Sequence, residues 1–198
     1  MARSLGRDHD AKRRAILRAA ARLFAAHGYG RASMAEVAAA CGVSKGTLYH
    51  YYDGKEALLF AVLDAHLAGL RDRVCGLAFA TDHPGDQLRA IVGELLAAYE
   101  GADAEHAVQL GALSALPPDR QAVLHGHQRD LVRFVRARIE RLAPRLATEP
   151  RRARAVTMSV FAMVNWHHRW DGRAGPAERA AYADTATALI LGGLPAVR

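Results

Sequence analysis

The chain has 198 residues, of which 51% are hydrophobic, 24% charged and 7% aromatic. This composition excludes a disordered chain, a collagen-like chain and a small disulfide scaffold. The sequence contains no apolar run of about 18 residues, the length that a membrane-spanning helix needs. The net charge is +7, and residues 1–55 hold ten lysines and arginines against four acids. Because such a basic block attracts polyanions, the charge favours a nucleic-acid partner, although a solvated helix face would carry the same excess.

The beginning of the chain shows clear helix boundaries. Ile16 and Phe24 belong to one apolar stripe of a first helix, which Gly28 is expected to end in a left-handed cap. Ser33 and Glu36 are then expected to form a capping box. In this motif the serine side chain accepts a hydrogen bond from a free backbone N–H, and the glutamate side chain reaches back to the backbone N–H of the serine. A short second helix is therefore expected to begin after Ser33.

A third short helix follows a glycine turn. Gly42 breaks the second helix, Ser44 is an N-cap, and the third helix runs to Tyr52. Two short helices joined by a glycine-containing turn are typical of a helix-turn-helix unit, here residues 33–52.

The rest of the chain is also expected to be helical, because no strand-like alternation lasts long enough to matter. Six further helices are expected to begin near Asp53, Pro84, residue 103, Pro118, Pro150 and Pro176. With the first three, they predict an all-α fold of about nine helices.

The second helix of a helix-turn-helix unit lies in the major groove, with its N-terminal residues at the base edges. At that end, Ser44 and Lys45 are hydrogen-bond donors and Thr47 carries a hydroxyl and a methyl group. Gly46 allows the backbone to approach the DNA closely. Tyr49 and Tyr51 are expected to reach phosphates or thymine methyl groups, and Lys55 a phosphate. Leu48 is expected to anchor the helix in the core.

Residues 28–38 and 41–58 resemble the N-terminal domain of TetR/AcrR-family repressors. The resemblance implies a three-helix helix-turn-helix domain at residues 1–55 and a helical ligand-binding and dimerisation domain at residues 56–198. It further implies a homodimer that binds a palindromic DNA operator and releases it when a small molecule binds. By position it implies DNA contacts from Ser33, Lys45, Gly46, Thr47, Tyr49, Tyr51 and Lys55. The position of His50 either packs or touches phosphate, depending on the family member.

The segment from Asn165 to Trp170 resembles a subset of such regulators that control fatty-acid, phenylacetate and sterol breakdown and respond to acyl-coenzyme A thioesters. Asp171 departs from the aromatic residue that often follows there. The expected ligand residues are Phe134, Asn165, Trp166, Arg169 and Trp170. Arginines at 129, 133, 136 and 145 are candidate partners for the coenzyme's negative charges. The alternative is that both tryptophans are core anchors and that the arginines form a solvated helix face.

The last two expected helices mix small residues with aliphatic ones, a composition that allows close packing against a second copy. The residues concerned are Val160, Ala162, Val164, Ala181, Ala183, Ala186, Ala188, Leu189 and Ile190. The family forms its dimer interface from these two helices, and a two-fold axis is needed to bind a palindrome. Packing of these faces within one chain is the alternative.

Other classes of function find little support in the sequence. Ten histidines are present, but His125 and His127 are two apart, which points them to different helix faces, and no zinc spacing appears. No nucleophile elbow, phosphate loop or dinucleotide motif indicates an enzyme, and no cofactor or membrane partner is expected. Cys41 and Cys75 are too few for a disulfide framework, which favours reduced thiols in the cytoplasm. The remaining alternatives are a drug-like or other metabolite as effector, or a ligand-binding protein that does not bind DNA.

Overall fold

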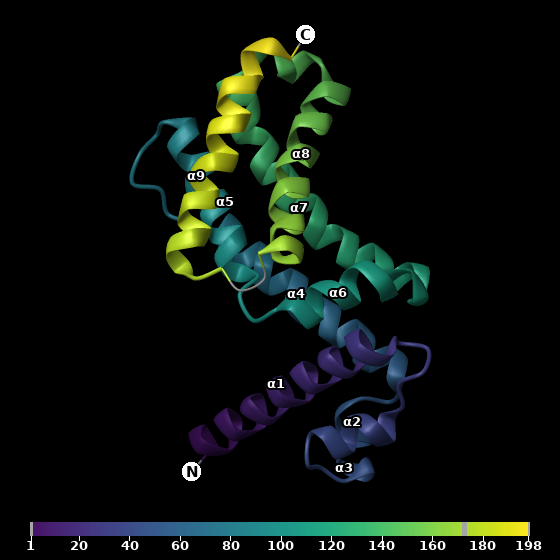
Figure 1. The fold of residues 1–198 in the computed structure, drawn as a ribbon. Coiled ribbons are helices and arrows are strands. Elements are labelled where there is room, and N and C mark those ends of the chain that lie inside the picture. Colours follow the sequence, from purple (N-terminus) through teal and green to yellow (C-terminus); the bar gives the residue numbers. More distant parts are fainter. Residues whose placement is uncertain (1, 172–173, 198) are drawn as a thin grey trace. The chain divides into compact units, whose positions relative to one another are not determined.

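The computed structural model describes residues 2–171 and 174–197, without the side chains of residues 2–8, 168 and 169, and its regular structure over that range is helical (Figure 1). Nine α-helices lie in the described part: α1 (Ala2–His27), α2 (Met34–Ala40), α3 (Lys45–Tyr51), α4 (Lys55–Cys75), α5 (Pro84–Ala98), α6 (Asp103–Ala112), α7 (Pro118–Leu142), α8 (Pro150–Trp170) and α9 (Pro176–Gly193). Short 3-10 turns follow α6, α7 and α9. The expected all-α fold is confirmed.

The predicted boundaries around α2 and α3 are confirmed by their hydrogen bonds. The Glu36 backbone N–H donates to Ser33 Oγ at 3.2 Å, and the Ser33 N–H donates to Glu36 Oε2 at 2.8 Å. The Ser33 hydroxyl also donates to Glu36 Oε2 at 2.8 Å, and these two bonds, from the hydroxyl and from the backbone N–H of Ser33, lower the pKa of the Glu36 carboxyl. Gly28 and Gly42 have φ angles of +79° and +64°, a conformation that strains any residue with a Cβ. The turn between α2 and α3 therefore depends on Gly42.

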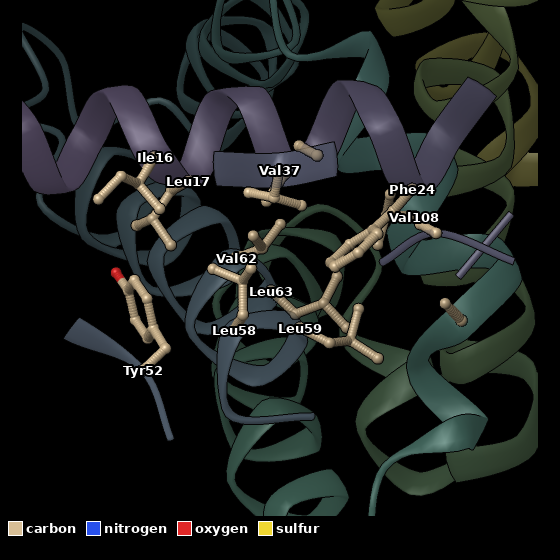
Figure 2. Packing of buried hydrophobic residues seen from close by; sticks show 14 of the residues in the cluster. Ile16, Leu17, Phe24, Val37, Tyr52, Leu58, Leu59, Val62, Leu63 and Val108 are labelled. Atoms are coloured by element: carbon tan, nitrogen blue, oxygen red, sulfur yellow. The ribbon is translucent and has the colours of Figure 1, made fainter. Parts of the chain in front are cut away.

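The chain divides into two compact units, each with its own core. The first comprises the residues up to Ala68 together with Gly101–His125, so it extends past residue 55 and includes α6, which packs on α1. Figure 2 shows its core, a cluster of buried side chains that includes Ile16 of α1 and Leu58 and Leu59 of α4. Full burial of each such side chain contributes about 1.5–3 kcal/mol, which fixes α2 and α3 against α1 and α4.

The second unit comprises Gly69–Glu100 and the chain after Gly126. Here α5 packs closely on α9 and both contact α8, around buried residues that include Leu88, Ile91, Leu95, Val135 and Val160. Both α4 and α7 begin in the first unit and end in the second. Over the described residues, the helices fall short of the length and apolarity needed to cross a bilayer.

Candidate functional site

Helix α3 is held from one side and exposed on the other. Leu48 is completely buried in the core of the first unit, which confirms it as the anchor of this helix. Lys45 and His50 are exposed, and the Tyr49 ring is 43% exposed although it is large and apolar. The Lys45 ammonium lies 5.9 Å from the centre of the Tyr49 ring. A cation and an aromatic ring thus stand together on the outer face of α3.

The first turn of α3 carries two hydroxyl groups and a glycine. Ser44 caps the helix, because its Oγ accepts a hydrogen bond from the Thr47 backbone N–H at 3.0 Å. The side-chain oxygens of Ser44 and Thr47 are 2.8 Å apart. A Cβ added at Gly46 would meet only Ser44 Oγ, at 3.8 Å. The fold itself therefore leaves room for a side chain at Gly46, and a need for glycine there would come from a partner outside the chain.

Tyr51 connects α3 to the basic beginning of α1. Its ring is half-buried and stacks on the His9 ring with the centres 4.9 Å apart. Exposed cations follow His9 along α1, namely Lys12, Arg13, Arg14 and Arg18. Sequence reasoning missed His9, because a contact between residues 42 positions apart leaves no local pattern. The contact places the positive charge of α1 next to the outer face of α3.

Lys55 has a different position from that expected of a free phosphate-binding side chain. Its ammonium donates to the carbonyl oxygens of Tyr29, Gly30 and Ala32, at 2.8, 3.0 and 3.0 Å, and lies 4.7 Å from the centre of the Tyr29 ring. An ammonium has three protons, so all of them are occupied in holding the segment that leads into Ser33.

Those expected ligand residues whose side chains the structure describes do not line one common site. Asn165 accepts a hydrogen bond from the Tyr99 hydroxyl at 2.6 Å. Trp166 and Trp170 are 61% and 59% exposed, so the alternative expectation that both are core anchors is wrong. The side chain of Arg169 lies outside the described residues. Trp170 instead packs edge-on against Tyr182, at 5.4 Å between ring centres.

Phe134 lies in a surface hollow of about 430 Å³ between the end of α4 and α7. Its lining includes Arg71, Cys75, Asp130, Arg133, Phe134 and Arg138. Arg133 was among the candidate arginines, whereas Arg71, Cys75 and Arg138 were not singled out by the sequence. A regular spacing on one helix cannot reveal them, because they come from two helices distant in the chain.

The exposed faces of α8 and α9 carry large apolar side chains. Met158, Trp166 and Leu189 are 44%, 61% and 65% exposed, and Ala162 and Ala188 are exposed as well. Four other residues expected on a dimer face are instead buried in the core of their own unit: Val160, Val164, Ala183 and Ala186. For these four, packing within one chain is the correct interpretation, because they point toward α5 and the other core helices.

The histidines do not form a metal centre in the part of the chain that the structure describes. No group of three or more histidine, cysteine, aspartate or glutamate side chains is placed there to hold a metal ion. His127 Nδ1 is instead 2.8 Å from Arg71 Nη1, a hydrogen bond that joins α7 to α4.

Comparison with known proteins covers both parts of the chain. The profile of bacterial regulatory proteins of the tetR family matches residues 16–62, and that of the tetracyclin repressor-like C-terminal domain matches residues 81–194. The transcriptional regulator UidR of Escherichia coli K12 is 34% identical over 95 residues, 41% of this chain and 48% of that protein. The chain thus spans about half the length of the curated relatives it matches.

Solved structures resemble nearly the whole chain. A TetR-family transcriptional regulator from Bordetella parapertussis has a TM-score of 0.81 and 35% identity over 90% of this chain and 93% of that one. AibR, solved in complex with isovaleryl coenzyme A and operator DNA, has a TM-score of 0.74 and 27% identity over 90% of this chain and 97% of its own.

Proposed function

Since this chain belongs to the tetR family of bacterial regulatory proteins, we propose that it represses transcription by binding a palindromic operator as a homodimer and leaves the operator when a small molecule binds. Members of the family are DNA-binding transcriptional regulators and not enzymes. The observation that carries the proposal is α3, anchored by buried Leu48 with Lys45 and Tyr49 on its outer face.

The proposed DNA-binding surface consists of the outer face of α3 and the residues around it. Lys45, Thr47 and Tyr49 would contact base edges and nearby phosphates, and Gly46 would let the backbone approach the DNA. Ser33, Ser44, His50 and Tyr51 surround these residues and would contact phosphates. Lys55 would act mainly by holding the segment before Ser33 in place.

The proposed dimer forms through the exposed faces of α8 and α9. Met158, Trp166 and Leu189 present apolar area that a second copy would remove from water. A two-fold dimer would bring two copies of α3 to half-sites about 34–36 Å apart, one turn of B-form DNA or a multiple of it. A palindromic operator in the cytoplasm is the partner that suits this symmetry.

The proposed effector is an acyl-coenzyme A thioester. Two observations support it: AibR, at 27% identity, was solved with isovaleryl coenzyme A, and the hollow beside Phe134 is lined by three arginines. A hydrophobic drug-like metabolite is the second candidate, because Phe134 offers an apolar wall. Stabilisation by the thioester and not by its free acid in a thermal-shift measurement would favour the first.

The first prediction tests operator binding directly. Selection from a library of random DNA duplexes should yield a palindromic sequence, and Lys45→Ala or Tyr49→Ala should weaken binding to it at least about tenfold. Both side chains point away from the core, so neither change should alter the fold or the dimer. Fluorescence anisotropy measures the affinity, and sedimentation velocity measures the dimer.

Two control variants are needed, one for the loss of a positive charge at Lys45 and one for the loss of the aromatic ring at Tyr49. Arg129→Ala removes one exposed positive charge from the second unit and should leave the affinity nearly unchanged. Tyr49→Phe keeps the ring and should lose less affinity than Tyr49→Ala. If both alanine variants bound the selected duplex as tightly as the wild-type protein, the assignment of α3 as the DNA-binding helix would be refuted.

A further inference from the structure

Among the described residues, the hollow between α4 and α7 contains a cation without a counter-ion. Arg138 Nη1 donates to the Phe134 carbonyl oxygen at 3.0 Å, and its Nε is buried without a hydrogen-bond partner among the described residues. No carboxylate among the described residues forms an ion pair with it. Burial and the nearby Arg141 lower the pKa of the Arg138 guanidinium. Keeping the Arg138 guanidinium charged in this place therefore costs free energy, and a nearby anion would offset that cost.

The other cations of the hollow already have partners. Arg71 donates two hydrogen bonds to Asp72 Oδ1, at 2.8 and 2.6 Å. Arg133 lies 3.4 Å from Asp130 Oδ1. Within the part of the chain that the structure describes, Arg138 is thus the arginine of this hollow whose charge remains uncompensated.

Aromatic rings hold Arg138 in place. Its guanidinium carbon lies 3.7 Å from the centre of the Phe134 ring and 5.1 Å from that of Phe79, and the two rings are stacked at 6.2 Å. A guanidinium fixed in this way loses little further freedom when it binds an anion. The hollow therefore combines a positioned cation with an apolar wall.

We propose that this hollow binds an organic anion, whose carboxylate or phosphate contacts Arg138 and whose apolar part lies against Phe134. The inference rests on the proposed function only in identifying this anion as the effector. A phosphate-bearing thioester and a free carboxylic acid share this chemistry, and they can be separated by experiment.

Cys75 provides a direct measure of occupancy, because it also lines the hollow. Cys41 is likewise partly buried but lies in the first unit, and burial raises the pKa of both thiols. Labelling of the full chain with N-ethylmaleimide, followed by peptide mass spectrometry, gives both rates from one sample. Isovaleryl coenzyme A at ten times its dissociation constant should slow labelling of Cys75 about tenfold and leave Cys41 unchanged.

The variants test whether Arg138 supplies the binding charge. Arg138→Gln should abolish the protection of Cys75, whereas Arg138→Lys keeps a positive charge and should retain part of it. Arg73→Gln is the control, because Arg73 lies on α4 near the hollow but pairs with Glu94 and is not part of the lining. Far-UV circular dichroism verifies that each variant is folded.

The outcomes separate the site from its proposed role. Protection by isovalerate as well as by the thioester supports a carboxylate in the hollow, and protection by the thioester alone supports a phosphate. Equal protection in wild-type protein and Arg138→Gln, or no protection by millimolar concentrations of either probe, overturns the inference. Binding to the selected operator is measured in parallel, so a protein that binds no DNA would refute the proposed function without affecting the labelling result.

Discussion

Lys55 illustrates how one side chain can have a role that its position in a motif does not reveal. Lys55 is the first residue of α4, a position at which the sequence predicts a contact with a phosphate. In the structure its ammonium bonds three carbonyl oxygens of the segment between α1 and α2. These carbonyls follow the end of α1, where partners for backbone oxygens are scarce. Lys55 thus supports the proposed DNA-binding surface by holding the segment before Ser33 in place.

We expect Lys55→Met to lower the free energy of unfolding by about 2 kcal/mol, because three carbonyls lose a charged donor. The slope of log affinity against log salt should remain that of the wild-type protein, since a lost phosphate contact would reduce it by about one. Urea titration and salt-dependent anisotropy measure the two quantities. Arg31→Met is the control: Arg31 makes one bond, to the exposed carbonyl of His27, and its loss should cost under about 0.5 kcal/mol. A flatter salt slope with unchanged stability would instead assign Lys55 to the DNA.

At the scale of elements, α4 and α6 contact each other through two histidines of the first unit. The rings of His66 and His106 are 6.5 Å apart, and His106 is almost completely buried. Burial lowers the pKa of His66 to about 4, although the Gln109 side chain opposes part of the shift. The neutral imidazole is therefore the form that the folded protein accommodates.

This shift predicts a loss of stability in acid. Between pH 6.5 and about 4 the unfolded chain binds a proton at His66 that the folded chain does not. The free energy of unfolding should therefore keep its full value above pH 6.5 and fall by up to about 1.4 kcal/mol per pH unit below it. Urea titrations at several pH values measure this slope, and His66→Gln should reduce it whatever the variant does to stability at pH 7. An identical slope in the variant would assign the acid sensitivity to other groups.

The bounds of the elements were predictable because they are encoded locally. Prolines and glycines mark helix ends along the chain, and Ser33 and Ser44 bind backbone N–H groups three residues away. The order of the nine helices in the described part of the chain therefore followed from neighbouring residues. Contacts that join distant segments were not predictable in this way. The stacking of His9 on Tyr51 and the packing of Arg138 on Phe79 depend on how segments distant in the chain meet, which hydrophobic periodicity alone does not determine.

Trp166 and Trp170, expected to bind a ligand, also show that residue spacing does not predict contacts between distant segments. Their spacing of four correctly placed Trp166 and Trp170 on one helix and made a shared binding face plausible. It could not show whether that face points into the core or to solvent, and both rings are largely exposed. Asn165, which the sequence grouped with them, instead accepts a hydrogen bond from Tyr99, the residue that follows α5. Residue spacing thus predicted neighbours along a helix but not their surroundings.

At the scale of the whole molecule, the proposed function requires two copies of the chain. One α3 can contact one half-site, and a palindrome is bound only when a two-fold axis relates two such helices. The apolar side chains on α8 and α9 are the surface that a second copy would cover. An isolated exposed apolar residue would need no explanation, but Met158, Trp166 and Leu189 occur on two helices that pack together.

Leu189→Glu tests this interface, because a dimer would have to bury the new carboxylate without a partner. We expect the dissociation constant of the dimer to rise at least about 100-fold, a difference of roughly 2.7 kcal/mol, and operator affinity to fall with it. Leu110→Glu is the matched control: Leu110 is 64% exposed, close to the 65% of Leu189, but lies on α6 in the first unit. Sedimentation equilibrium over a range of concentrations should find this control as dimeric as the wild-type protein. If Leu189→Glu also remained a dimer, or if the control dissociated equally, the two copies would have to meet through another surface.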